Sequence, residues 1–543
     1  MPGLCVALVF ALLSFIPSLL PRPALFQGLV TGIDAAIGYG LGVLGAFVWR
    51  EFADRPPRQP STRAWQALMV VGGTSAVVAM LLGIRWQRLA SVLVDIEPQH
   101  PLMMLLVPPL TVLLFVLLVA AARTVRSGYR KVAALLSRHM GARAARALGV
   151  GLLVGAGFAL ATGVVWEGAL RLLDRTFALA DAETPGRVTR PTTELRSGSP
   201  QSLVEWDDLG REGRVYVGRG LLAPDISEIT GDPALDPIRT YAGVRSAEDT
   251  EERADLAVRD LERAGGLERA HLLVVTTTGT GWVEPSAVGS FEVLTGGDAA
   301  SVAMQYSYLP SWLSFLVDQE RAREAGRVLF DAVYERWSAL PAADRPKLYV
   351  FGESLGSFGG ETAFSGEFGL RNRTSGALFV GPPNFNPLYR GFVDERDPGS
   401  REVEPVYQSG RTIRFTNFPR RDIEPAHRAW DGSRVLYLQH ASDPITWWSP
   451  DLILQRPDWL EEQRGHDVME ETRWVPFVTF WQISADLALG FSTEPGHGHN
   501  YTGEHVDGWA AVLQTDWPAE QLDQLRSLVR DGGMRKPLPR PPG

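Results

Sequence analysis

Cysteine is almost absent from this sequence of 543 residues, and the one present, Cys5, lies within an apolar run. A single thiol cannot form a disulfide within one chain, and it cannot build a metal site made of several thiolates. Cysteine usage therefore excludes an intrachain disulfide and a metal site built from several thiolates. It does not indicate whether the protein's compartment is oxidising or reducing.

Acidic residues are scarce in the first 176 positions. This part has 16 Lys and Arg against 7 Asp and Glu, a net charge of +9, whereas the remainder has 37 against 55, a net charge of −18. So uneven a distribution indicates two environments, and the acidic second part argues against nucleic acid as a partner. We expect a first domain at 1–176, a linker at 177–211 that is rich in Thr, Pro, Ser and Gly, and a second domain at 212–543.

Long apolar runs fill the first part. Five segments, at roughly 3–20, 27–49, 66–83, 102–122 and 148–170, each approach the roughly 20 residues that cross a bilayer as a helix. The first lacks a basic start and a small-residue cleavage site, so a retained helix is favoured over a signal peptide. The sequence therefore predicts an α-helical transmembrane bundle of about five helices.

Basic residues around these segments indicate the orientation. Eleven fall in the two connections on one side and five on the other. Because cytoplasmic loops carry the excess of Lys and Arg, the N-terminus is expected inside the cell. Five spans then put everything after residue 176 outside, as an extracytoplasmic domain of a multi-pass membrane protein.

From about residue 212, short apolar runs alternate with amphipathic helices. Strand-like runs begin at 214–222 and continue with "PIRTYAG", "AHLLVVTTT", "SVAMQYSYLP", "KLYVFGES", "SGALFVGPP" and "RVLYLQHASDP". Strands that alternate with helices and are apolar on both faces are typical of a mostly parallel sheet flanked by helices. Ligand sites in such sheets lie at the C-terminal ends of the strands.

Three residues with catalytic chemistry occur in the order Ser, Asp, His. Ser354 ends a strand within "GESLG", Asp443 ends a later strand, and His499 lies beyond both in "GHGHNY". A serine hydroxyl is a weak nucleophile that needs an imidazole to take its proton, and the imidazole needs a carboxylate to fix its tautomer. Their order and their places at strand ends predict an α/β-hydrolase triad.

Alternatives remain for two members of this triad. His497 could be the base in place of His499, and Asp422 or Asp467 could be the acid, although no strand precedes either. His497, His499 and His505 could instead bind a metal together. That hypothesis is weaker, because no strong set of carboxylates or thiolates accompanies them, and we expect neither a metal nor an organic cofactor.

Backbone amides near the serine are candidates for stabilising an oxyanion. The amide of Leu355 begins the helix after the serine, and the glycine-containing loop "TTTGTGW" offers the amides of Gly279 and Thr280. Tryptophans nearby are expected to line an apolar substrate pocket: Trp282, Trp312 and Trp447.

Several motifs together resemble a known family. These are "SFIPSLLPR", "TGIDAAIGYGLG", "TTTGTGWVEP", "YSYLPSWLSFLVD", "FGESLGSFGGE", "GPPNFNPLY", "LQHASDPITWW" and "PGHGHNY". They resemble the bacterial membrane-anchored α/β-hydrolases that are common in actinobacteria, over nearly the whole chain. One departure is Glu353, a charged residue before the serine where many hydrolases carry His, Tyr or an apolar group. It could raise the basicity of the imidazole or bond a backbone amide.

The resemblance implies an integral-membrane serine hydrolase with Ser354 as nucleophile, in the bilayer and acting on a membrane lipid or lipid-like ester. Esters of lipids, including aminoacylated lipids, are plausible substrates within the family. An acyltransferase that passes the acyl group to a lipid or an envelope glycan would use the same triad. A non-catalytic membrane module on the same fold is the third hypothesis.

Overall fold

The computed structural model of the chain describes residues 1–54, 56, 59–162, 176–186, 188–417 and 429–533. The chain divides into two compact units. Unit 1 comprises Met1–Leu173, Ser449–Glu461 and His466–Leu489, and unit 2 comprises Asp174–Trp448, Glu462–Gly465 and Gly490–Gly543. Two segments from within the expected second domain, 212–543, therefore belong to unit 1.

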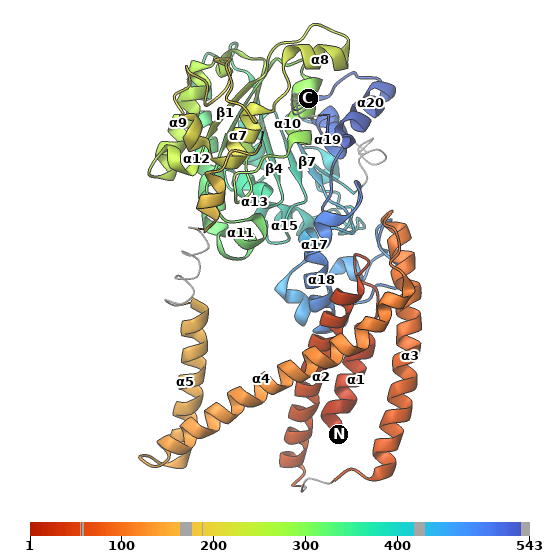
Figure 1. Ribbon diagram of the computed structural model, residues 1–543. Coiled ribbons are helices and arrows are strands. Elements are labelled where there is room, and N and C mark those ends of the chain that lie inside the picture. The colour runs from red at the N-terminus through yellow and green to blue at the C-terminus, as the bar shows by residue number, and fades with distance from the viewer. Residues whose placement is uncertain (55, 57–58, 163–175, 187, 418–428, 534–543) are drawn as a thin grey trace, which may run out of the picture. The chain divides into compact units, whose positions relative to one another are not determined.

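Unit 2 contains a sheet of seven strands in the order β1-β3-β2-β4-β5-β7-β6, in which every neighbouring pair is parallel (Figure 1). In the centre, Leu272 of one strand pairs with Leu348 of the next. The strands are β1 (Ile238–Ala242), β2 (His271–Thr276), β3 (Ala299–Met304), β4 (Lys347–Glu353), β5 (Gly376–Val380), β6 (Ile413–Thr416) and β7 (Arg434–Leu438). This sheet confirms the parallel α/β architecture expected for the second part of the chain.

Helices cover both faces of this sheet. The α-helices of unit 2 are α7 (Gly210–Gly218), α8 (Ala223–Thr230), α9 (Thr250–Arg263), α10 (Pro285–Leu294), α11 (Ser311–Val317), α12 (Gln319–Ala339), α13 (Leu355–Glu361), α14 (Glu367–Arg373), α15 (Pro387–Asp394), α17 (Pro444–Trp447), α19 (Glu504–Leu513) and α20 (Ala519–Arg530). The 3-10 turns are η2 (Trp206–Leu209), η3 (Val244–Ser246), η4 (Gly266–Glu268), η5 (Gln408–Gly410) and η8 (Gly490–Ser492).

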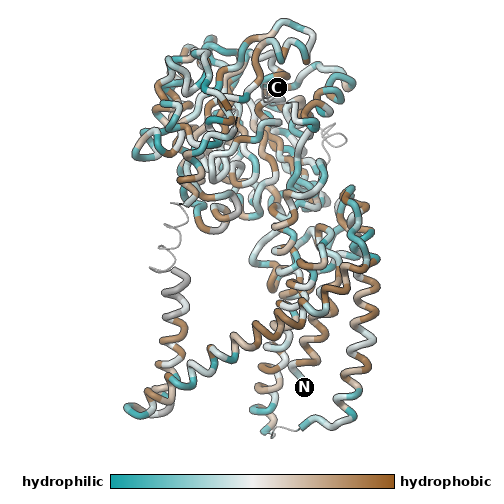
Figure 2. The backbone as a smooth tube through the Cα atoms, in the orientation of Figure 1, coloured by the Kyte–Doolittle hydropathy of each residue, from teal (hydrophilic) through white to brown (hydrophobic). Residues whose placement is uncertain are grey.

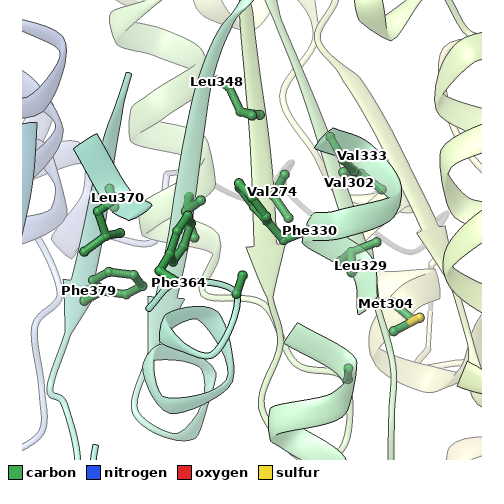
Figure 3. Packing of buried hydrophobic residues seen from close by; sticks show 14 of the residues in the cluster. Val274, Val302, Met304, Leu329, Phe330, Val333, Leu348, Phe364, Leu370 and Phe379 are labelled. Atoms are coloured by element: carbon green, nitrogen blue, oxygen red, sulfur yellow. The ribbon is translucent and has the colours of Figure 1, made fainter. Parts of the chain in front are cut away.

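Alternate residues of each strand supply the two hydrophobic cores. In β2, Val274 joins the core beneath α9, α12 and α13, whereas Val275 joins the core beneath α10, α19 and α20. Successive side chains of a strand point to opposite faces, so a strand covered on both sides needs apolar residues throughout. Figure 3 shows the first core, with Phe330 of α12 beside Val274.

One expected strand is a helix. Residues 214–222 alternate like a strand, but α7 runs through Gly218. Its buried residues include Gly213, Tyr216 and Val217, which is the spacing of one helical face. Gly213 leaves room for the ring of Tyr241, because a Cβ there would lie 2.5 Å from that ring. The first strand of the sheet is instead β1.

Part of the segment expected to be a linker packs on the sheet. The amide of Ser197 donates to the carbonyl of Arg239 in β1 (3.1 Å), and the amide of Arg239 donates to the carbonyl of Leu195 (3.1 Å). The buried Arg196 guanidinium donates to the carbonyls of Val217 and Leu221. These contacts extend the edge of the sheet with residues 195–197.

Unit 1 contains long apolar helices. They are α1 (Pro2–Leu13), α2 (Ala24–Phe52), α3 (Thr62–Leu93), α4 (Val107–Leu136), which follows η1 (Pro101–Leu106), α5 (Ala142–Thr162) and α18 (Val478–Leu487), with η6 (Pro450–Ile453) and η7 (Asp458–Leu460). Within the described residues, three helices are long and apolar enough to cross a membrane: Ala24–Phe52, Thr62–Leu93 and Pro101–Leu136. Hydrophobic residues run along much of α3 and the first part of α4 (Figure 2).

The other two expected spans differ from these three. The segment expected at 3–20 forms α1, whose 12 residues are fewer than the roughly 20 that a span needs. The segment expected at 148–170 lies partly in α5 and partly in residues 163–175, which are outside the described residues.

Helix α18 is held against the N-terminal part of unit 1 by polar side chains. The buried Asp486 carboxylate accepts from the amides of Leu19 (3.0 Å) and Leu20 (3.3 Å), and the Gln482 amide donates to the carbonyl of Ile16 (2.8 Å). Burial raises the pKa of Asp486 to about 6, although Arg22 opposes the rise. The segment that carries α18 is therefore fixed to the turn between α1 and α2.

The core beneath α12 gives a direct test of the fold. Phe330 is 1% exposed and packs edge-on against Phe364, whereas Phe368 is 80% exposed. Phe330→Ala should lower the free energy of unfolding of unit 2 by about 3–5 kcal/mol, because it removes buried apolar contacts and leaves a cavity. Phe368→Ala should change it by less than about 0.5 kcal/mol. Chemical denaturation of the full chain in detergent, followed by tryptophan fluorescence, measures both, and equal losses would contradict the packing.

Candidate active site

Ser354 lies in the tight turn between β4 and α13. Its backbone has φ +54° and ψ −126°, a conformation that residues other than glycine rarely adopt. Its amide donates to the carbonyl of Val380 (2.8 Å). Both glycines of the motif are required by close approach, because a Cβ on Gly352 would lie 2.3 Å from the Gly356 carbonyl and one on Gly356 would lie 2.4 Å from the Thr276 carbonyl. The turn therefore explains the Gly-x-Ser-x-Gly spacing.

Asp443 follows β7 and is completely buried. One carboxylate oxygen, Oδ2, accepts from His499 Nδ1 (2.7 Å) and from the Tyr501 hydroxyl (2.8 Å). The other, Oδ1, accepts from the Ile445 amide (2.8 Å). Burial raises the pKa of the Tyr501 hydroxyl, and the charge of Asp443 raises it further, so Tyr501 remains a donor. These bonds satisfy a carboxylate that has no contact with solvent.

His499 presents its second ring nitrogen without a partner. Nε2 is buried and has no hydrogen-bond partner among the residues that the structure describes. The ring lies against Gly381, where a Cβ would be 2.5 Å from its Cε1, and Gly381 directly follows the Val380 that bonds the Ser354 amide. The bond from Nδ1 to Asp443 makes Nε2 the nitrogen that can accept a proton.

The alternative residues occupy other positions. The hydroxyl of Thr493 donates to the carbonyl of His497 (2.6 Å), which fixes that backbone within the same loop. Asp422 lies outside the described residues, and Asp467 belongs to unit 1. His505, one of the three histidines of the metal hypothesis, uses both ring nitrogens on Glu353 and Ser286.

The expected oxyanion donors begin α13 and follow β2. Among the described residues, the backbone amides of Leu355, Gly279 and Thr280 have no hydrogen-bond acceptor. The loop itself is tightly held: the amide of Thr278 donates to the Trp282 carbonyl (3.2 Å), and Gly279 has no space for a Cβ, which would lie 2.4 Å from Ser314 Oγ. The Leu355 amide, at the start of a helix, and the two loop amides are therefore available to a negatively charged oxygen.

The three expected pocket tryptophans lie in different surroundings. Trp282 lines a cavity of about 20 Å³ together with Tyr216 and Arg239. Trp447 is 1% exposed, and its indole N–H donates to the His440 carbonyl (3.0 Å), so it supports the loop that carries Asp443. Trp312 lies in α11, and its side chain is outside the described part of the structure.

Among the described residues, the Glu353 side chain hydrogen-bonds neither of the groups suggested from the sequence, the catalytic imidazole or a backbone amide, but another histidine. Its carboxylate accepts from Nε2 of the buried His505 (2.8 Å). Burial alone would lower the pKa of His505, but the charges of Glu353, Glu284 and Glu504 outweigh it and raise that pKa above 6.5. The sequence suggests His505 only as a metal ligand, and no spacing in the sequence links it to Glu353.

Another buried acid lies close to the turn that carries Ser354. Glu361, at the end of α13, accepts from the side chains of Asn386 (3.0 Å) and Tyr437 (3.1 Å). Asn386 also donates to Ser357, whose hydroxyl donates to the Ser354 carbonyl (2.7 Å). Burial raises the pKa of Glu361 to about 7. This network, which the sequence did not reveal, fixes the first turn of α13.

Comparison with protein families agrees with this architecture. The profile of an alpha/beta-hydrolase family matches residues 238–525, more than half of the chain. The chain belongs to this family. A companion profile for the N-terminus of the alpha/beta-hydrolase family matches residues 15–220. No curated protein and no solved structure matches the chain. Membership supports a hydrolase-type function.

Gly381 offers a test of the geometry in this alpha/beta-hydrolase. It has φ +53°, and a Cβ there would collide with the His499 ring. Gly381→Ala should slow the labelling of Ser354 by a fluorophosphonate about 100-fold, because a displacement of about 1 Å suffices for such a loss. Gly391→Ala, in α15, is the matched control, because a Cβ there meets nothing within 4 Å. Equal rates for the two variants would contradict the position of His499.

Proposed function

We propose that this chain is an integral-membrane serine hydrolase that cleaves an ester of a membrane lipid, an aminoacylated lipid included. Ser354 is the nucleophile, His499 the base and Asp443 the acid that orients the base. The observation that carries the proposal is the buried His499, which donates to Asp443 through Nδ1 and leaves Nε2 without a partner among the described residues.

The reaction follows from these atoms. Nε2 of His499 takes the Ser354 proton as Oγ attacks the ester carbonyl, and the backbone amides of Leu355 and of Gly279 or Thr280 bind the resulting oxyanion. His499 then returns the proton to the leaving alcohol as the ester bond breaks. In the second half, His499 takes a proton from water, the hydroxide attacks the acyl-enzyme, and the acid is released as Ser354 regains its proton. No cofactor takes part in these steps.

The long apolar helices of unit 1 support a membrane lipid as the substrate. Three of its helices have the length and composition of membrane spans, and the family's N-terminal profile covers residues 15–220. A catalytic unit attached to a bilayer meets esters of that bilayer at a high effective concentration. Attachment therefore favours lipid esters over soluble ones.

We also propose that unit 2 lies outside the cell. The basic residues gather in two regions, around the connection between α2 and α3 and along the second half of α4 into the start of α5, which favours the cytoplasm for both. This reasoning does not depend on whether α1 crosses the membrane. It requires the segment expected at 148–170 to cross, because that segment alone separates the second basic region from unit 2.

The nucleophile is tested by labelling of the full chain in membranes with a fluorophosphonate. Ser354→Ala should abolish labelling, and His499→Ala should slow it by at least about 1,000-fold, because the hydroxyl loses its base. His497→Ala should leave the rate nearly unchanged. Ser338→Ala, at the end of α12, is the control for loss of a serine hydroxyl. Persistent labelling of Ser354→Ala would refute the assignment.

The substrate class is tested by comparing a lipid ester with a soluble ester of the same acyl group. The purified protein in liposomes should turn over a phospholipid-like ester at a higher kcat/KM than a soluble ester with the same acyl chain. Mass spectrometry of the products separates two reactions: free acid indicates hydrolysis, whereas an acyl group recovered on an added alcohol or glycan indicates transfer. A preference for the soluble ester would contradict a lipid substrate.

A further inference from the structure

Helix α19 begins five residues after His499, and its first two residues make buried ion pairs of opposite polarity. Glu504 pairs with His440, which lies three residues before Asp443. His505 pairs with Glu353, which directly precedes Ser354. Adjacent residues therefore connect one helix end to both of the other segments that carry the proposed triad. Helix α19 itself is anchored in the core beside α10 (Figure 1).

The hydrogen-bond partners of His440 define where its protons lie. Nδ1 faces the carbonyl of Gly498 (2.8 Å), which can only accept, so Nδ1 carries a proton. Nε2 faces the Glu504 carboxylate at 2.6 Å, which places a second proton between these two groups. The ring is completely buried and stacks on Tyr501, with centroids 4.0 Å apart. Since Gly498 precedes His499, this one imidazole touches the base loop and Glu504 together.

The partners of His505 define a chain of hydrogen bonds in the same way. The Ser286 hydroxyl has one proton, which it donates to Glu284 (2.5 Å). Ser286 Oγ therefore accepts from His505 Nδ1 (2.9 Å), and His505 Nε2 donates to Glu353 (2.8 Å). An imidazole that donates from both nitrogens is the charged form.

We propose that Glu504 and His505 are positioning residues that, through His440 and Glu353, set the acid loop and the nucleophile turn relative to the His499 loop. This inference rests on the proposed function, because its readout is turnover at Ser354. None of the four residues is required to touch the substrate. Each acts through the backbone next to a triad member.

The physical reason is the cost of an unmatched buried charge. Removal of one partner from such a pair leaves the other desolvated and uncompensated, so the backbone that carries it shifts toward any available partner. Ser354 is sensitive to such a shift, because its left-handed φ of +54° persists only while its surroundings enforce it.

The decisive experiment measures kcat and KM for an ester on the full chain, normalised to the fraction of serine that a fluorophosphonate titrates. Glu504→Gln and His505→Gln should each lower kcat per titrated serine about 100-fold and leave KM within about twofold, since about 1 Å of misplacement costs that much. Glu353→Gln/His505→Gln, which replaces the ion pair by an amide pair, should recover at least about tenfold relative to His505→Gln. His271→Gln is the matched control. His271 is the first residue of β2, at the end of the strands away from Ser354, so this variant should retain the wild-type kcat.

The pH profile supplies a second readout. The groups that face His505 are Glu353 at the end of β4, Glu284 and Ser286 at the start of α10, and Glu504 beside it on α19. Because the folded pKa of His505 is raised, its imidazole is charged at pH 6.5, and the positive half of the pair is lost as the pH rises through the raised pKa. The wild-type kcat should therefore fall on the alkaline side. The double variant, which lacks both ionisable groups, should not show this fall.

Failure of the inference differs from failure of the proposed function. Wild-type kcat per titrated serine in both Glu504→Gln and His505→Gln would overturn the positioning role, as would an unchanged alkaline fall in the double variant. A purely structural role would lower the titratable fraction and leave kcat per titrated serine unchanged, which would also overturn it. Turnover that survives Ser354→Ala would instead refute the proposed function.

Discussion

The burial of one carboxylate governs the candidate site. Asp443 has no contact with solvent, so each of its oxygens must accept hydrogen bonds from the protein. The donors come from its own loop, through Ile445, and from the loop that carries His499 and Tyr501. Satisfying this charge therefore orients the imidazole, fixes its tautomer and joins two loops that a long stretch of sequence separates.

The proposed nucleophile, Ser354, depends on space around its backbone, whereas Asp443 depends on hydrogen-bond donors. Ser354 can hold its strained backbone because Gly352 and Gly356 admit carbonyls that any side chain would exclude. The side chains behind it, Ser357 and Asn386, then connect the turn to Glu361. A rigid surround of this kind holds a reactive hydroxyl in place before a substrate arrives.

Features that depend on local pattern could be predicted from the sequence. The strands β2, β4, β5 and β7 are continuous apolar runs, and the residues after them lie at one edge because parallel strands share their direction. The strand predicted at 214–222 is wrong, because the alternation of these residues fits a strand while their burial follows a helix. A weak periodic signal over nine residues does not separate these two structures.

Features that depend on pairing between distant residues could not be predicted. His497 and His499 share one short loop, and only the position of Asp443 distinguishes them. Glu353 stands out in the sequence as an unusual residue before the serine, but its partner, His505, is 152 residues away. No periodicity marks Glu504 either, because its partner lies in a loop after another strand.

The route of the chain through the two units has a consequence for synthesis and for engineering. Between Asp443 and His499, residues 449–461 and 466–489 belong to unit 1, where Gln482 and Asp486 bond backbone groups near its N-terminus. On a ribosome, unit 1 is among the first parts made but must await α18, and the hydrolase sheet must await residues beyond 490. A truncation that kept only 174–543 would retain residues 449–461 and 466–489 but lack the N-terminal part of unit 1 that they bind. A soluble catalytic fragment of this protein therefore requires an internal deletion with a new loop, because one terminal cut does not separate the units.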